Sequence, residues 1–367
     1  MRDHRHKPYA KTSLLPLETH KMSIKDHSPH FPSYISSMKS SRSIAIIGAG
    51  LTGLSCAQAL VAQGCRVQVF EKSRGVGGRM STRQFEAWAC DHGAQYFTAR
   101  DPGFKQQVEI WQKTGAAALW EAKITSFDAE GWQSITSSKG RYVGTPSMTA
   151  PAKQLAKDLS IQFSTTIDQL IREGEKWTLH SKEHGQLDPR FDAIVLAIPS
   201  KQAEPLVQPH CASLYERCQD AVMAPCWALM IYANDRLPFD FDAAFINQGM
   251  FSWIARSSSK PHRLSDEAWV AHATTEWSAT HEKLTKDEAA PLLIAGFETL
   301  TGYRPQTYQT HLWRFARLGH ASHHGHLFDP NLQLGLCGDW TSTEKVEGAW
   351  LSGQAVARDI AQHLEAS

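Results

Sequence analysis

The feature that most constrains the fold is a glycine-rich turn between a short strand and a helix. Residues 43–47 are a β-branched run, the turn GAGLTG follows without a gap, and 54–63 is an Ala-rich helical segment. Gly48 permits the tight turn, Gly50 leaves room for a pyrophosphate against the backbone, and Gly53 lets the helix pack close to the strand. The pattern predicts a dinucleotide whose phosphates face the helix N-terminus.

A second strand ends in an acid at the spacing that this motif requires. Residues 66–70 read as the strand, and Glu71 follows Gly48 by 23 residues. The Glu71 carboxylate can accept hydrogen bonds from a ribose, and an acid at this point favours a free 2′-hydroxyl over a 2′-phosphate. The strand, the helix and the spaced acid together predict a bound dinucleotide.

Two further segments indicate which dinucleotide is bound. Residues 74–79 read RGVGGR, a glycine cluster that suits a loop around a second stretch of pyrophosphate. The apolar run 332–337 ends near Asp339, and a helix opens at 346–353. An acid at such a strand end can bind a ribityl hydroxyl, and the helix N-terminus can stabilise negative charge on a flavin ring. NAD has no ribityl chain, so FAD is favoured.

These motifs together resemble the flavin-containing amine oxidase superfamily, and within it the renalase-like flavoproteins. The superfamily resemblance rests on GAGLTG from Gly48, Glu71, RGVGGR from Arg74, CGDW from Cys337 and EGAWLSG from Glu347. The renalase-like resemblance rests on DHGAQYF from Asp91, SWIARSSSKP from Ser252, HLWRFA from His311 and CGDW from Cys337. Together, these resemblances cover nearly all of the chain after residue 42.

The resemblance implies an α/β fold with a Rossmann-like FAD-binding domain of the amine oxidase type and a second, α+β substrate domain. It places five residues around the pyrophosphate: Gly48, Gly50, Gly53, Gly78 and Arg79. It places Glu71 on the adenosine ribose and Asp339 on the ribityl chain. Three residues would open the helix beneath the pyrimidine edge of the flavin: Glu347, Gly348 and Ala349. Cys337 is interpreted as a small buried residue, and covalent attachment of FAD is left open.

One geometric constraint gives the domain organisation. If segments near both ends of the chain contact one extended FAD, the middle must leave that domain and return. We expect the FAD-binding domain to comprise 43–104, 141–204 and 325–365. The substrate domain then comprises 105–140 and 205–324, which carry most of the tryptophans. Most of these should pack in the core, with Trp253 and Trp313 as the exceptions that face the cofactor.

The resemblance also places several motifs around the flavin, and these supply candidate residues for the donor side: Gln95, Tyr96, Arg256, Trp313 and Arg314. Arg256 or Arg314 can pair with a substrate phosphate or carboxylate, and Trp313 can pack on a flat ring. Either arginine can equally form a salt bridge between domains. Lys260 and Lys345 are weak candidates for the lysine that many amine oxidases hold near flavin N5.

Flavin oxidases take a hydride at N5 and return two electrons to O2, so no protein nucleophile is required. The renalase-like motifs imply oxidation of misreduced 2- or 6-dihydro-NAD(P), which yields NAD(P)+ and hydrogen peroxide. Two alternatives stay open at this point: a flavin-containing amine oxidase acting on a primary amine or polyamine, and a non-catalytic FAD-binding redox module. The substrate, the electron acceptor and the oligomeric state are open as well.

Composition limits the partners. Lys plus Arg total 38 against 37 for Asp plus Glu, which leaves no global field to hold nucleic acid. No apolar stretch approaches the roughly 18 residues of a membrane-spanning helix, so we expect no integral membrane segment. Seven cysteines without a C-x-x-C pair fit a reducing compartment, so we expect a cytoplasmic protein.

Two histidine-rich stretches are interpreted as solvated segments. Residues 1–42 are basic and lack periodicity, which predicts a disordered tail, although a transit peptide or a later start at Met22 or Met38 is possible. Four histidines crowd the loop before Leu327: His320, His323, His324 and His326. They lie on a polar loop with no supporting helix, so we expect no metal site.

Overall fold

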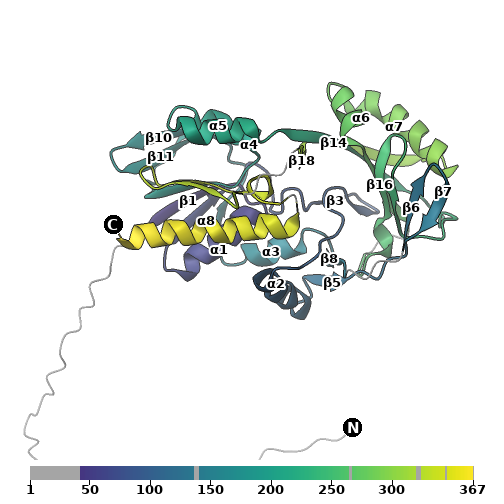
Figure 1. Ribbon diagram of the computed structural model, residues 1–367, viewed down its shortest axis with the longest axis horizontal. Coiled ribbons are helices and arrows are strands. Elements are labelled where there is room, and N and C mark those ends of the chain that lie inside the picture. Colours follow the sequence, from purple (N-terminus) through teal and green to yellow (C-terminus); the bar gives the residue numbers. More distant parts are fainter. Residues whose placement is uncertain (1–41, 136–139, 264–266, 320–323, 344, 367) are drawn as a thin grey trace, which may run out of the picture. The chain divides into compact units, whose positions relative to one another are not determined.

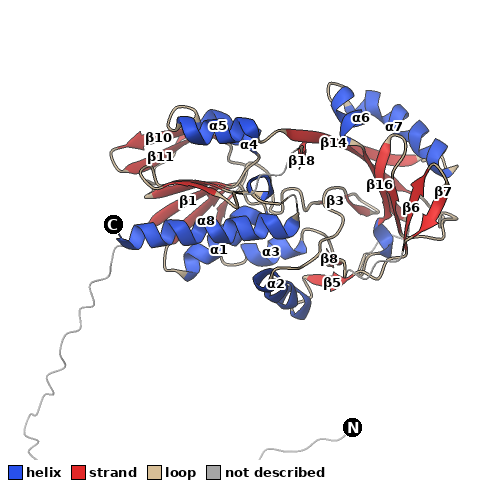
Figure 2. Ribbon diagram, viewed as in Figure 1, coloured by secondary structure: helices blue, strands red, loops and turns tan. Residues whose placement is uncertain are grey.

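Two large sheets carry the fold, one mainly parallel and one mainly antiparallel (Figures 1 and 2). The computed structural model describes residues 42–135, 140–263, 267–319, 324–343 and 345–366. These residues belong to one unit that spans Ser41–Ser367. The tail expected at 1–42 therefore lies outside the described residues, except for Arg42.

The first sheet has six strands in the order β19 (Leu327–Asp329), β20 (Leu334–Leu336), β13 (Ala193–Leu196), β1 (Ser43–Ile47), β2 (Arg66–Phe70) and β9 (Ser160–Gln162). All neighbours are parallel except β19 and β20. The runs in β1 and β13 are apolar at nearly every position because both faces of the sheet are covered.

Alternate residues of β1 enter two different cores. Ile44 and Ile46 pack against helices α1 (Leu51–Ala62), α3 (Ala150–Ala156) and α8 (Val346–Ala366). Ala45 and Ile47 face a second core, formed with α4 (Ser200–Val207), α5 (Ala212–Asp220) and the sheet of β10 (Ile167–Glu173), β11 (Lys176–Ser181) and β12 (Gly185–Gln186). In Figure 1, α8 lies along α1 on one side of this sheet.

The second sheet has seven strands in the order β18 (Thr307–Leu318), β14 (Met223–Tyr232), β17 (Ala268–Ala273), β16 (Phe251–Arg256), β15 (Ala243–Ile246), β6 (Ile124–Asp128) and β7 (Gly131–Ser134). Only β15 and β6 pair in parallel. Helices α6 (Thr275–Thr280) and α7 (Lys286–Thr301) cover one face, where Leu293 and Phe297 pack on Trp269. Helix α7 starts at a capping box of Thr285 and Glu288.

Several short elements lie outside the two large sheets. They are the hairpin of β3 (Thr82–Gln84) and β4 (Ala89–Asp91), helix α2 (Pro102–Lys113), the pair of β5 (Ala117–Leu119) and β8 (Tyr142–Gly144), and the single turns η1 (Ser257–Ser259) and η2 (Asp339–Thr341). Within the described part of the chain, no helix has the length and apolar character needed to cross a membrane.

The expected α/β fold class is confirmed. Every strand of the six-stranded sheet comes from 43–104, 141–204 or 325–365, and every strand of the seven-stranded sheet comes from the intervening segments. Helices α2 and α5 differ from the expectation, because both pack with the first sheet. Trp111 of α2 belongs to the same core as Ile44 and Ile46 of β1, and Leu214 of α5 belongs to the core on the other face of the six-stranded sheet.

Candidate functional site

A cavity of about 1940 Å³ is lined by residues of both sheets. Its wall includes residues within 47–52, 70–83, 92–100, 165–168, 197–206, 311–317 and 337–349, together with one or two residues from each of β14, β15, β16 and β17. Ligand cavities for drug-sized molecules are roughly 300–1,000 Å³. This volume therefore has room for a dinucleotide and a second molecule.

The glycine-rich turn forms one end of the cavity. Gly48 has φ +106°, and a Cβ on it would lie 2.6 Å from the Ala197 carbonyl oxygen. A Cβ on Gly53 would lie 2.0 Å from the Gly48 carbonyl oxygen, so helix and turn meet at a distance that only glycine allows. Gly50 instead has open space beside it. It precedes α1, whose N-terminus has no side-chain cap. An anion can therefore approach these backbone N–H groups.

Glu71 fixes the conformation of this turn. One carboxylate oxygen accepts a hydrogen bond from the Ala49 N–H at 2.8 Å, and the other accepts from the Ser73 N–H at 2.8 Å. The side chain is buried but lines the cavity. Each oxygen keeps a further lone pair, so the expected hydrogen bond to a ribose is compatible with this geometry. The role in holding the turn is an additional one that the sequence motif did not indicate.

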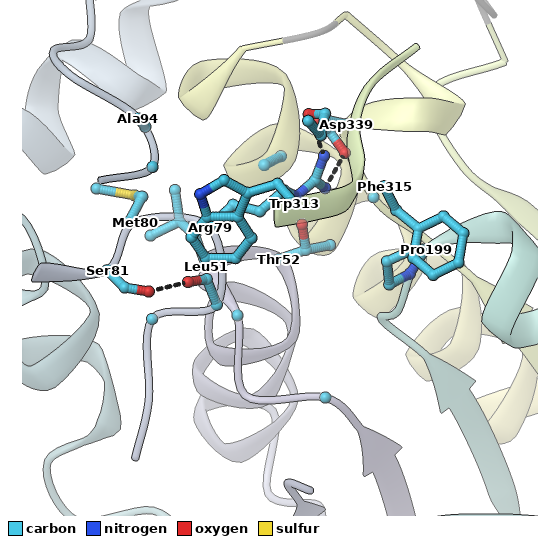
Figure 3. Close-up of a pocket in the computed structure, with 18 of the residues that line it drawn as sticks. Leu51, Thr52, Arg79, Met80, Ser81, Ala94, Pro199, Trp313, Phe315 and Asp339 are labelled. Carbon is cyan, nitrogen blue, oxygen red and sulfur yellow. Dashed lines mark hydrogen bonds and ion pairs between the residues drawn. The ribbon is translucent and has the colours of Figure 1, made fainter. Parts of the chain in front are cut away.

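The second glycine loop packs directly on the first. The Gly77 N–H donates to the Ala49 carbonyl at 2.9 Å, and a Cβ on Gly78 would lie 3.4 Å from the Gly50 Cα. The loop brings Arg79 to Asp339, and the two form an ion pair of 2.5 Å (Figure 3). Two residues expected on different parts of FAD thus meet at one point of the cavity wall.

Four of the five expected donor-side residues line the cavity: Gln95, Tyr96, Trp313 and Arg314. Trp253 lines it as well, as expected. Arg256 does not. Its side chain is buried over the Trp269 ring, 3.3 Å from Glu267 and 3.6 Å from Asp242. Both partners lie in the same expected domain as Arg256, so it neither lines the cavity nor forms a salt bridge between domains, and we do not retain it among the donor-side residues.

Three histidines that the sequence did not single out lie on the donor-side wall: His92, His272 and His311. His272 Nε2 and Trp313 Nε1 both contact the His92 carbonyl oxygen, at 3.0 and 2.8 Å. The His92 ring stacks on Trp313, and the His311 ring meets both edge-on. Burial lowers the pKa of His92 to about 3 and the pKa values of His272 and His311 to about 4. All three rings are neutral at pH 7.

A buried charge network lies behind this wall. Asp91 accepts hydrogen bonds from Lys260 Nζ at 3.0 Å and from Arg263 at 2.6 Å, and Lys260 also donates to the Gln95 amide oxygen at 3.0 Å. Burial by itself would raise the pKa of Asp91, but the two cations hold it well below its usual range. The Gln95 amide nitrogen donates to the carbonyls of Asp91 and Gly93. The network therefore fixes the segment that carries His92 and Gln95.

Similarity to known proteins places the chain in a family. A model of the NAD(P)-binding Rossmann-like domain matches residues 46–110, and a model of the flavin containing amine oxidoreductases matches residues 100–361. The chain belongs to this second family. It is an FAD-dependent oxidoreductase, as the sequence motifs predicted.

Two curated relatives match short stretches of this oxidoreductase, and the chain spans less than a fifth of their length. A 4,4′-diapophytoene desaturase of Staphylococcus aureus strain Newman is 35% identical over 79 residues, which are 19% of this chain and 16% of the desaturase. The corresponding desaturase of Staphylococcus haemolyticus is 48% identical over 50 residues, or 14% of this chain and 10% of that protein.

Solved structures of other oxidases share the fold over most of the chain. A putative protoporphyrinogen oxidase from Exiguobacterium sp. 255-15 has a TM-score of 0.73 at 11% identity, and the match covers 88% of this chain and 99% of that one. Cyclohexylamine oxidase from Brevibacterium oxydans IH-35A has a TM-score of 0.67 at 14% identity, covering 89% and 100%. At these identities the likeness shows a common fold.

The residues of the flavoprotein cavity fit FAD. The uncapped N-terminus of α1 and the open side of Gly50 suit the pyrophosphate, and Arg79 lies on the same wall. At the start of α8, only Ala349 of the three expected residues lines the cavity. Glu347 instead accepts hydrogen bonds from the N–H groups of Arg100 and Asp101, at 2.6 and 2.7 Å. Its effect on a flavin would therefore be indirect.

Three further sets of residues were singled out in the sequence: the two lysines, Cys337 and the crowded histidines. Lys345 lines the cavity, whereas Lys260 lies in the buried network. Cys337 is a buried part of the cavity wall, and burial raises the pKa of its thiol. Of the crowded histidines, His320 and His323 lie outside the described residues, and His326 pairs with Asp359 at 2.7 Å. Where the chain is described, no three potential metal-ligating side chains come together.

Proposed function

We propose that this flavoprotein oxidises the 2- or 6-dihydro isomers of NAD(P), with O2 as the final electron acceptor. One dihydronicotinamide dinucleotide, one O2 and one proton would give NAD(P)+ and hydrogen peroxide. The observation that carries the proposal is the charge of the donor side. Three carboxylates line the cavity among the described residues: Glu71, Asp168 and Asp339. Glu71 lies beside the glycine turn, Asp168 follows Thr165, whose N–H donates to the Glu71 carbonyl, and Arg79 neutralises Asp339.

A protonated amine would therefore find no free counter-ion on the donor side of the described wall. That wall carries Arg83, Arg314 and Arg317 and the neutral histidines. Its charge suits an anionic dinucleotide and disfavours a cationic amine. This supports the dinucleotide over the amine as the electron donor.

The donor-side residues suit the charge change of the proposed reaction. When bound, FAD supplies a hydride acceptor that passes two electrons on to O2. Loss of a hydride leaves the nicotinamide ring cationic, so charged imidazoles beside it would oppose the reaction. His92, His272 and His311 are neutral, and Trp313 offers a flat face for the ring. No proton leaves the donor, so these residues need to position it and exclude water rather than act as a base.

An amine donor is the second candidate, and it is favoured by the aromatic residues of the same wall. Tyr96 and Trp253 lie 5.6 Å apart and both line the cavity. Aromatic faces can hold an ammonium group without a carboxylate. The family itself includes amine oxidoreductases.

Anaerobic reduction of the purified flavoprotein separates these functions. Mixing with 2- and 6-dihydro-NAD should bleach the flavin absorbance rapidly, whereas 4-dihydro-NAD should be a poor donor. Primary amines and polyamines should leave the spectrum unchanged. Reduction by amines with release of an aldehyde, and by neither dihydro isomer, would replace the proposal with the amine oxidase. Failure of every donor to reduce the flavin would favour a non-catalytic redox module.

A further inference from the structure

Six arginines that line the cavity have no carboxylate partner among the described residues: Arg74, Arg83, Arg100, Arg141, Arg314 and Arg317. Three of them are close to the donor-side histidines in strand pairing or in the chain: Arg83 of β3 belongs to the hairpin whose second strand ends just before His92, and Arg314 and Arg317 follow His311 on β18. Among the described residues none of the three forms an ion pair, whereas Arg79 is paired with Asp339 and Arg256 with Glu267. Unpaired arginines on a cavity wall are uncompensated positive charge, which an anionic ligand can neutralise.

A β-bulge accounts for the position of the two arginines on β18. Strand β18 pairs with β14 at Trp313↔Cys226 and again at Arg317↔Ala224, so two extra residues of β18 lie opposite Pro225. Proline has no N–H to donate to the ladder, and pairing is interrupted there. The bulge abolishes the usual alternation of faces, and every residue of 311–317 lines the cavity. Figure 3 shows two of them, Trp313 and Phe315, on this wall.

Arg83 and Arg317 lie near the histidine cluster, and Arg314 adjoins Trp313 in the chain. Arg83 is close enough to lower the pKa values of His92 and His311, and Arg317 acts in the same direction on His272. His272 is held at the His92 carbonyl, 3.0 Å away. The neutral rings and the unpaired cations thus occupy one side of the cavity. The uncapped N-terminus of α1 lies at the FAD end of the cavity and is available to the cofactor's own pyrophosphate.

We propose that Arg83, Arg314 and Arg317 form an anion subsite that binds the phosphate groups of the electron donor, while the flat wall of Trp313 receives its reacting ring. This inference rests on the proposed function and identifies which part of the donor gives it affinity. Guanidinium groups bind phosphate oxygens through paired hydrogen bonds, which lysine cannot reproduce. Donors that carry more phosphate should therefore bind more tightly.

A donor series measures this dependence in the wild-type flavoprotein. The 2-dihydro forms of nicotinamide riboside, the mononucleotide and the dinucleotide present the same reacting ring with none, one and two phosphates. We expect KM to fall at each step and the dinucleotide KM to rise with salt, because exposed charges are screened. Equal KM values for riboside and dinucleotide would overturn the subsite.

Substitution tests the named residues. Arg83→Gln, Arg314→Gln and Arg317→Gln should each raise the dinucleotide KM by about 10-fold, the order of one charged hydrogen bond, and should leave the riboside KM unchanged. Arg358→Gln removes an exposed arginine from α8, away from the cavity wall, and should change neither value. Loss of bound FAD in the three variants, read from the ratio of flavin to protein absorbance, would assign the arginines to the cofactor and overturn the subsite.

A binding measurement separates this inference from the proposed function. ADP-ribose has both phosphates and lacks the nicotinamide ring, so it probes the subsite without turnover. Titration of the oxidised flavoprotein, followed by the flavin difference spectrum, should give weaker binding in each of the three arginine variants. If no dihydronicotinamide reduces the flavin but ADP-ribose binding still depends on these arginines, the proposed function fails and the subsite stands. If reduction is normal and ADP-ribose binds all variants equally, only the subsite fails.

Discussion

Among single residues, Lys260 stands out because its charged side chain is buried. Its ammonium group is fully buried, and its partners are Asp91, Gln95 and the face of Trp120. Burial lowers the pKa of Lys260, and the Asp91 carboxylate opposes that effect. A buried charge of this kind is tolerated only while its partners remain in place.

Replacing Lys260 by Met should lower the free energy of unfolding by about 3 kcal/mol, because the Asp91 charge and the Gln95 amide oxygen each lose a buried donor. Urea denaturation followed by tryptophan fluorescence measures the loss. The matched control is Lys176→Met. That residue pairs with Asp192 at the same 3.0 Å but is half exposed, so its loss should be under about 1 kcal/mol. Equal losses in the two variants would contradict a structural role for the buried network.

His272 gives the protein a pH dependence of known sign. Its pKa is about 4 in the folded chain and about 6.5 when unfolded, so only the unfolded chain takes up this proton between those values. Stability should therefore fall as the pH drops through this window. In His272→Gln, the loss between pH 7 and pH 5 should be smaller by about 2 kcal/mol, because 1 pKa unit corresponds to about 1.4 kcal/mol. Denaturation of both proteins at the two pH values provides the comparison, and an unchanged pH dependence would refute the assignment.

Residues that act within one local unit were predictable from the sequence. Residues that reach their place only through the pairing of distant strands were not. Gly48, Gly53 and Glu71 act within one strand–turn–helix unit, so their spacing alone indicated their positions. Arg256 depends on the register of β16 with β17, which brings it beside Glu267. The sequence carries no signal of that register. His272 likewise reaches the cavity only through the pairing of its sheet.

Among the secondary-structure elements, the crossing of α1 and α8 matters most for the site. A Cβ on Gly353 would lie 2.3 Å from the Thr52 carbonyl oxygen. The Gln354 amide donates to the Ser55 carbonyl at 3.0 Å, and the Ser55 hydroxyl donates to the Trp350 carbonyl at 2.9 Å. Both helices begin at the cavity, where Leu51 and Val346 line its wall. Their separation therefore sets the position of both helix N-termini.

Gly353→Ala should push α8 away from α1 and destabilise the fold by about 1–3 kcal/mol or more, the usual range for overpacking. Bound FAD should decrease as well, because the start of α8 moves with the helix. Thermal unfolding and the flavin-to-protein absorbance ratio measure the two effects. Gln362→Ala, on the exposed side of the same helix, is the control and should change neither. If the Gly353→Ala protein is destabilised but keeps its full flavin content, the spacing of the two helices does not determine FAD binding.

For the molecule as a whole, the cavity walls come from both sheets, so the cofactor should contribute to the stability of the entire fold. The fold class was predictable because the two ligand-facing motifs lie near opposite ends of the chain. The packing of α2 and α5 was not. Their apolar faces fit either sheet, and only tertiary contacts select the first one.

Removal of FAD should lower the unfolding temperature by several degrees, since a ligand present at about 1,000 times its Kd stabilises a fold by roughly 4 kcal/mol. Differential scanning calorimetry of the protein before and after cofactor removal measures the shift, and added FAD should restore it. Glu71→Ala, which frees the N–H groups of Ala49 and Ser73, should show a smaller shift because it retains less cofactor. The same unfolding temperature with and without FAD would show that the walls are stable without it.

The expected FAD contacts are divided between 48–79 and 339–349, and this division has a consequence for biosynthesis. A nascent chain exposes the first glycine turn early, but the partner of Arg79 and the start of α8 are translated only near the end. High-affinity capture of the cofactor must therefore wait until residues 339–349 have been translated and have folded, and chains truncated before Asp339 should be made without colour.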